Sequence, residues 1–154
     1  QHIACAQIRS KDYLNWYYDS KFGWIKLIYE ENGDVLGYAV IAVKGCSGKE
    51  RLKNVKILTL VDMLWDFNKD YVFNSMLEYA EVLARSCNVD TLICSINRKE
   101  GRKNLLKNAF LKIPSTVYFG YYSSNRAINL SKNIEDWYIT RGDADAAGNL
   151  APNG

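Results

Sequence analysis

The polar side chains best suited to chemistry lie between positions 62 and 71 of the sequence. Asp62 follows a run of apolar residues, and a carboxylate at such a place can act as a general base. Asn68 can adopt the left-handed backbone conformation, and Lys69 can pair with a phosphate as a point charge. A short loop that leads from a strand into a helix also directs backbone N–H groups at an anion. The segment is therefore a candidate phosphate-binding loop.

Other residues of the same loop argue against phosphate binding. The span Trp65–Tyr71, "WDFNKDY", has no glycine that would let phosphates approach the backbone, and Phe67 is bulky. Asp66 and Asp70 add negative charge at the mouth of the loop. The simpler interpretation of Asp70 is a helix N-cap. Asp62 could equally cap or anchor the loop, so the residues by themselves leave both interpretations open.

Hydrophobic periodicity predicts the elements that hold this loop. Val55–Leu64 is nearly continuous in apolar residues, which predicts a central strand covered on both faces. The span 71–87 has apolar residues at helical spacing. Asn32 and Gly33 separate two runs rich in β-branched residues, 24–30 and 35–43, which predicts a β-hairpin. The other predicted elements are helices at 10–18 and 99–110 and strands at 89–97, 116–123 and 137–140.

This order of elements predicts a mixed α/β fold with a partly antiparallel sheet. We expect residues 1–145 to form a single domain and residues 146–154 to be a flexible tail. Because Gln1 is not a methionine, we expect the chain to be the C-terminal part of a longer protein.

The composition is that of an ordinary globular protein, with 48% hydrophobic residues, 24% charged residues and a net charge of +3. The four cysteines have no C-x-x-C spacing and the single histidine is His2, so we expect no metal site. We expect a cytoplasmic protein with no membrane partner, because the sequence shows neither a signal-peptide pattern nor a membrane-length apolar run. Basic residues cluster at 98–112. A solvated helix face explains them better than nucleic-acid binding does.

Several segments match a known pattern in their order. They are "NGDVLGYAVIAV" (32–43), "VKILTLVDML" (55–64), "YVFNSMLEYAEVLARSCNVDTLICSIN" (71–97) and "LLKNAF" (105–110). Together they resemble the GNAT (Gcn5-related N-acetyltransferase) family of acyl-CoA-dependent N-acyltransferases. The resemblance implies a GNAT-like fold, acetyl-CoA or another acyl-CoA as cofactor, and a small amine or amino sugar as acceptor.

The two ends of the chain are similar to one GNAT subgroup. "KDYLNWYY" (11–18) and "DWYITRGDAD" (136–145) look like its opening and closing segments. In that subgroup this domain is often the second half of a two-domain chain, which implies an N-terminal GNAT-like domain, or a second copy of this chain, as partner. We interpret Asp143 and Asp145 as part of a turn or of a contact with such a lobe.

The resemblance also implies a set of site residues. Asn97 stands where the family often has an asparagine after the strand that follows the cofactor helix. The implied cofactor-binding residues are Leu60, Val61, Asp62, Asn68, Lys69, Asp70, Tyr71 and Asn97. The family's Q/R-x-x-G-x-G/A loop pattern is missing here.

The family's catalytic acid is missing as well. It is commonly a tyrosine before a closing "GF", where this chain has Leu105, Leu106 and Ala109. Tyr118 on the next predicted strand could replace it, and Asp62 and Asn97 are the other catalytic candidates. Both departures favour an alternative to an enzyme. That alternative is a catalytically inactive GNAT-like lobe that serves as a structural or ligand-binding partner of another GNAT domain.

Overall fold

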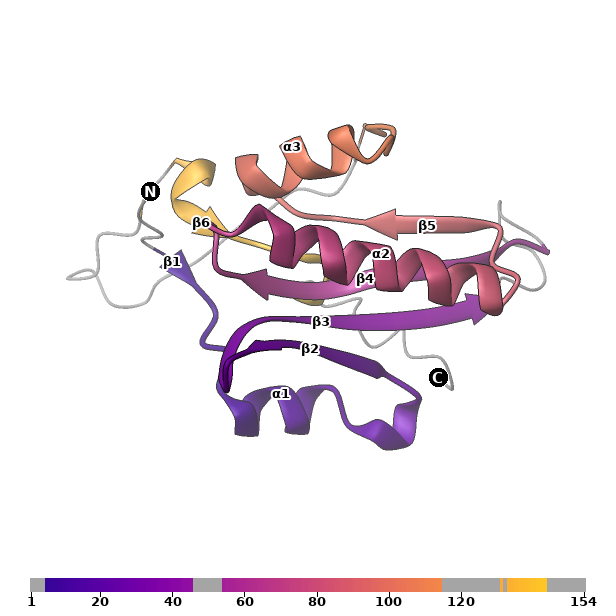
Figure 1. Ribbon diagram of the computed structural model, residues 1–154, viewed down its shortest axis with the longest axis horizontal. Helices are drawn as coiled ribbons and strands as arrows, with labels where there is room; N and C mark the ends of the chain where they lie inside the picture. The colour runs from indigo at the N-terminus through magenta and orange to yellow at the C-terminus, as the bar shows by residue number, and fades with distance from the viewer. Residues whose placement is uncertain (1–4, 46–53, 115–130, 132, 144–154) are drawn as a thin grey trace.

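The computed structural model describes residues 5–45, 54–114, 131 and 133–143, which build a four-stranded sheet with flanking helices (Figure 1). The strands are β1 (Cys5–Ala6), β2 (Ile25–Glu31), β3 (Asp34–Gly45), β4 (Lys56–Trp65), β5 (Thr91–Cys94) and β6 (Trp137–Tyr138). The helices are α1 (Lys11–Tyr17), α2 (Asp70–Ser86) and α3 (Lys99–Lys107), with 3-10 turns at Ser20–Phe22, Ile134–Asp136 and Arg141–Asp143. The predicted mixed α/β class and partly antiparallel sheet are confirmed.

The main sheet has the strand order β2-β3-β4-β5, which makes β4 a central strand as predicted. β2 and β3 form the predicted hairpin, because Asn32 and Gly33 take the positive φ values of 54° and 86° that its tight turn requires. β4 pairs in parallel with β5, but only as far as Leu60 and Cys94. Beyond that pair β4 runs on to Trp65, past the end of β5 (Figure 1).

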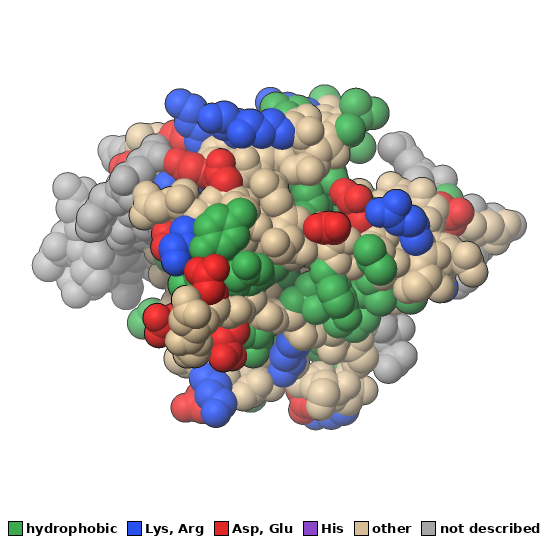
Figure 2. Space-filling model, viewed as in Figure 1, with side chains coloured by type: hydrophobic (Ala, Val, Ile, Leu, Met, Phe, Trp, Pro, Cys, Tyr) green, Lys and Arg blue, Asp and Glu red, His purple; other side chains and the backbone are tan. Residues whose placement is uncertain are grey.

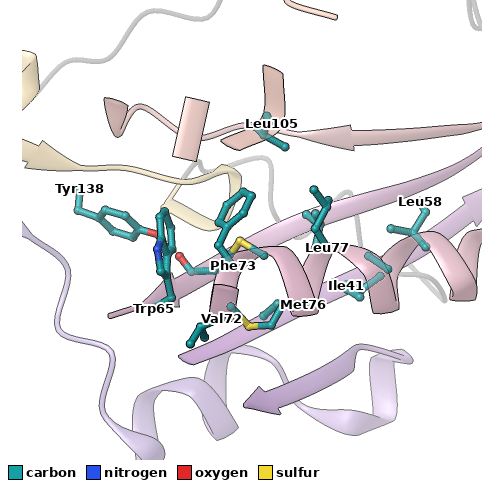
Figure 3. Close-up of a cluster of buried hydrophobic side chains, with 13 residues drawn as sticks. Ile41, Leu58, Trp65, Val72, Phe73, Met76, Leu77, Leu105 and Tyr138 are labelled. Atoms are coloured by element: carbon teal, nitrogen blue, oxygen red, sulfur yellow. The ribbon is translucent and has the colours of Figure 1, made fainter. Parts of the chain in front are cut away.

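Hydrophobic clusters cover both faces of the sheet. On one face, α2 packs the apolar positions predicted from its periodicity against the strands (Figure 3). The buried residues of α2 are Val72, Phe73, Met76, Leu77 and Ala80. On the other face, Tyr18 after α1 and Trp24 before β2 pack on Val40 and Val61. The two-sided burial explains why β4 reads as a continuous apolar run.

A β-bulge in β4 decides where its one buried carboxylate lies. Val40 of β3 is opposite Asp62, whereas Ile41 is opposite Leu60, so Val61 is the extra residue. The carboxylate of Asp62 accordingly lies 2.9 Å from the hydroxyl of Tyr38, which packs on the α1 side of the sheet. The bulge thus directs Asp62 away from the core beneath α2.

The C-terminal part of the described chain returns to the N-terminal part. β6 pairs in parallel with β1, and Thr140 forms an isolated bridge with Ile96 just past β5 (Figure 1). β1 was not predicted, because two residues carry no periodicity. No helix of the described residues is long and apolar enough to cross a bilayer.

Some predicted boundaries were wrong. Lys69 is the N-cap of α2 and Asp70 is its first helical residue, so the interpretation of Asp70 as the cap is corrected. Asp62 lies inside β4 and not at its end. β5 is shorter than the predicted strand 89–97, because the chain leaves the sheet after Cys94. The predicted strand 116–123 and the predicted tail 146–154 lie outside the described residues.

Candidate functional site

The end of β4, where it has passed β5, lies at the centre of the candidate site. Backbone groups there could bind a ligand, but the chain's own side chains occupy the region. The hydroxyl of Tyr138 donates a hydrogen bond to the carbonyl of Met63. The ring of Trp65 packs edge-on against Phe67 at 4.7 Å and against Phe73 at 4.8 Å between centroids. Figure 3 shows Tyr138 and Trp65 at the same end of the core cluster.

The N–H groups of the loop between β4 and α2 donate hydrogen bonds to acceptors within the chain. The carboxylate of Asp66 accepts a hydrogen bond from the N–H of Asn68 at 3.0 Å, and its carbonyl accepts one from the N–H of Lys69 at 2.8 Å. The N–H of Asp66 itself donates to the carbonyl of Leu36. A side-chain carboxylate therefore takes a loop amide that a bound phosphate would otherwise use.

Side chains at the start of α2 also form hydrogen bonds and an ion pair with other parts of the chain. Asp70 accepts a hydrogen bond from the side-chain amide of Asn104 on α3, at 2.9 Å. The hydroxyl of Tyr71 donates to Glu31 at 2.9 Å, and the Lys69 ammonium lies 3.7 Å from the same carboxylate. Lys69 is one-third exposed, so this ion pair is a surface contact between the loop and the β2–β3 hairpin.

Asp62 is buried and accepts several hydrogen bonds. One carboxylate oxygen accepts from the N–H of Met63 at 3.0 Å and from the hydroxyl of Thr140 at 2.8 Å. The other accepts from the hydroxyl of Tyr38 at 2.9 Å and from the Nε of Arg9 at 3.0 Å. Because the carboxylate is only 3% exposed, it has no direct route to bulk water. This arrangement resembles a structural anchor more than a free base.

Arg9 connects Asp62 to the C-terminal segment. Its terminal amino group lies 2.7 Å from Asp143, and its own side chain is 4% exposed. Burial alone would lower the pKa of Arg9, but Asp62 and Asp143 raise it above its usual value. Burial and the charge of Asp62 likewise raise the pKa of the Tyr38 hydroxyl. The network therefore keeps Arg9 charged and Tyr38 protonated at neutral pH.

Asn97 holds the segment around β6 in place. Its amide nitrogen donates to the carbonyl of Trp137 at 2.7 Å and to that of Ile134 at 3.1 Å. Its amide oxygen accepts from the N–H of Ile139 at 2.8 Å. The amide that the resemblance assigned to a cofactor thus forms hydrogen bonds with the backbone of the C-terminal segment.

The remaining predicted site residues are spread over both faces of the sheet. Leu60 belongs to the core beneath α2, and Val61 belongs to the cluster on the α1 side. Tyr118 lies outside the described residues. Within the described part of the chain, no group of histidine, cysteine, aspartate and glutamate residues could hold a metal ion.

Sequence reasoning missed Arg9 and Thr140. Arg9 lies in an irregular stretch with no periodicity, and its two carboxylate partners are 53 and 134 positions away. Asp143 was interpreted as part of a turn or of a contact with another lobe, and it lies in the 3-10 turn Arg141–Asp143. No single-sequence signal pairs residues at such separations.

Comparison with known proteins gives similarity at the level of structure. No protein-family model matches the chain, and no curated protein matches it. A predicted acetyltransferase from Clostridium acetobutylicum, crystallised with acetyl-CoA, aligns over 73% of this chain and 79% of its own, with a TM-score of 0.54 and 19% identity. A ribosomal-protein-alanine N-acetyltransferase from Brucella melitensis biovar Abortus 2308 aligns over 74% and 82%, with a TM-score of 0.56 and 13% identity.

A protein from Thermus thermophilus aligns over 80% of this chain and 88% of its own, with a TM-score of 0.55 and 14% identity. Identities this low establish the arrangement of elements and not the chemistry. The chain has a GNAT-like fold.

Proposed function

We propose that this chain is a GNAT-like lobe that does not turn over acyl-CoA by itself and that supports another GNAT-like domain. The observation that carries this proposal is the closed loop before α2. Asp66 takes the N–H of Asn68 with its carboxylate and the N–H of Lys69 with its carbonyl. A pyrophosphate would have to displace that carboxylate and then lie beside its negative charge.

The residues at the end of β4 do not fit a bound acyl-CoA either. The carbonyl of Met63 already accepts the Tyr138 hydroxyl, and Trp65 and Phe67 pack next to it. The guanidinium of Arg98 lies 4.9 Å above the Phe67 ring and is itself buried. An extended ligand would have to expel packed aromatic side chains, each of which contributes a large buried area.

The partner that we propose for this lobe is an N-terminal GNAT-like domain or a second copy of the chain. Its role would be structural, or it would complete a ligand site that the partner holds. We also propose a cytoplasmic location, since Cys87 and Cys94 are both free thiols.

The second candidate function is an acyl-CoA-dependent N-acyltransferase that acts on a small amine or amino sugar. The extent of the structural similarity favours it, since two acetyltransferases align over about three quarters of this chain. In that case acetyl-CoA or another acyl-CoA would lie near the start of α2, and Asp62 and Tyr118 would be the acid–base candidates. Arg9 would first have to release Asp62.

An assay of thiol release separates the two functions. Purified chain is mixed with acetyl-CoA and a panel of amines and amino sugars, and free CoA is measured with a thiol reagent. We expect release at the rate of the buffer control. The acyltransferase would instead be supported by CoA release that requires both the chain and an acceptor. Asp62→Asn should then abolish this release, and Asp12→Asn should leave it unchanged. Asp12 is a suitable control because it is exposed on α1.

A further inference from the structure

The outward face of α3 carries a row of positive charge. Lys99, Lys103 and Lys107 follow one another at intervals of four residues, and all three are exposed. At 1.5 Å per residue, the row extends for about 12 Å along the helix. Figure 2 shows Lys and Arg side chains gathered over α3 at the top of the view, with hydrophobic side chains next to them.

The three lysines have no anionic partner among the described residues. Arg102 on the same helix is paired with Glu135 at 3.0 Å, and Glu100 lies 3.2 Å from the buried Arg98. No such ion pair holds the lysines within the described part of the chain. Like charges four residues apart on a helix repel one another and destabilise it. The row is therefore a local cost to the fold, which a bound anion would remove.

The row surrounds an exposed leucine. Lys99, Arg102, Lys103, Leu106 and Lys107 form one open surface patch on α3. Leu106 is 60% exposed and lies among these basic side chains. The aliphatic parts of the lysine side chains add apolar surface around Leu106, while their ammonium groups stay in water.

The charge and polarity of this surface indicate what kind of partner fits it. Lysines around an exposed leucine complement a peptide that presents an apolar side chain between carboxylates. A nucleic acid fits less well, because none of the described residues that form this patch is aromatic and could stack on a base, and its one arginine is already paired. The net charge of only +3 also provides little long-range attraction for a polyanion.

We propose that the Lys99–Lys107 face of α3 is a docking surface for an acidic polypeptide segment that inserts an apolar side chain over Leu106. This surface is independent of the β4–α2 loop, so the inference does not depend on whether the chain binds acyl-CoA.

The test uses fluorescence anisotropy with two labelled peptides and one oligonucleotide. The first peptide alternates glutamate and leucine, the second has glutamate and serine, and the oligonucleotide is a single strand of twenty thymidines. They are titrated with the full chain, with Lys99→Glu/Lys103→Glu/Lys107→Glu, and with Leu106→Ser. The control is Lys11→Glu/Lys21→Glu/Lys26→Glu, which makes the same change in net charge at exposed positions around α1 and β2.

We expect the glutamate–leucine peptide to bind more tightly than the other two probes, and the α3 charge reversal to weaken it by about tenfold or more. The control reversal should change its affinity less than about twofold, and Leu106→Ser should weaken only the leucine-containing peptide. Stronger binding of the oligonucleotide would assign the surface to nucleic acid and overturn the proposal. Equal loss in the control, or no binding of the peptide, would also overturn it. Circular dichroism checks that each variant is folded.

Discussion

The guanidinium of Arg9 lies between two carboxylates, 3.0 Å from Asp62 and 2.7 Å from Asp143. This contact joins the segment before α1 to the centre of the sheet and to the last described turn. It explains how β1 and β6, each only two residues long, are held beside the main sheet. A buried ion-pair network thus lies beside the part of β4 that continues past β5.

Removing Arg9 should strongly destabilise the protein. Arg9→Ala leaves the buried carboxylate of Asp62 without its cationic partner, and we expect a loss of about 3–5 kcal/mol in the free energy of unfolding. Urea unfolding followed by tryptophan fluorescence measures it. The matched control is Arg85→Ala, which breaks the exposed pair with Glu81 and should cost less than about 1 kcal/mol. Equal effects of the two substitutions would contradict the structural role of the network.

Gly142 should not tolerate a side chain. A Cβ atom there would collide with the hydroxyl of Tyr18 and would lie 3.2 Å from the Cβ of Asp62. We expect Gly142→Ala to cost about 1–3 kcal/mol in unfolding free energy. Tyr18→Phe removes the colliding oxygen, so the double variant should recover part of that loss relative to the sum of the single changes. Strictly additive effects would show that the two residues do not touch.

Asn97→Ala should loosen the segment around β6. The substitution removes the acceptor of the Ile139 N–H and the donor to Trp137, which we expect to cost about 1–3 kcal/mol. Hydrogen exchange read by NMR should show faster exchange of the Ile139 amide, while amides in the middle of α2 keep their protection. Asn108→Ala is the control. Its exposed side-chain amide donates hydrogen bonds to Asn74 on α2 and to the carbonyl of Asn104 on α3, so its loss should leave the Ile139 amide unchanged. An unchanged Ile139 amide would refute the role of Asn97.

Cys94 should resist alkylation in the folded protein. Burial raises the pKa of its thiol to about 12, so very little reactive thiolate exists at pH 8. We expect iodoacetamide to modify Cys94 about a thousandfold more slowly in the folded chain than in urea, as measured by peptide mass spectrometry. Since the folded pKa is the higher one, Cys94 stabilises the fold below the pKa of the unfolded thiol. That contribution is lost as the pH rises toward 12. Rapid labelling at pH 8 without denaturant would contradict the raised pKa of the Cys94 thiol.

Local sequence patterns were sufficient for the elements that build the sheet. Asn32 and Gly33 determine the hairpin through their positive φ, and the spacing of Phe73, Met76 and Leu77 determines the buried face of α2. Asp70 shows where such reasoning fails. It resembles a cap, but Asn104 from another helix binds it within the first turn. The cap rule describes isolated helix ends, and here a contact between helices outweighs it.

The polar network could not be predicted in the same way. Asp62 stood out because it interrupts an apolar strand, yet the sequence does not reveal that a bulge turns it toward Tyr38 and Arg9. Bulges and long-range ion pairs depend on strand register. A single sequence determines that register only weakly where both faces of a strand are apolar.

The most direct test of the central claim is calorimetric titration of the chain with acetyl-CoA, with desulfo-CoA and adenosine as controls. Asp66→Gly is titrated in parallel, because it frees the N–H of Asn68 and removes the competing charge. If the loop is closed from within, wild type gives no binding heat at millimolar acetyl-CoA, and any binding appears first in Asp66→Gly. Micromolar binding by wild type that Lys69→Glu weakens would contradict the closed loop and restore the acyltransferase as the first candidate.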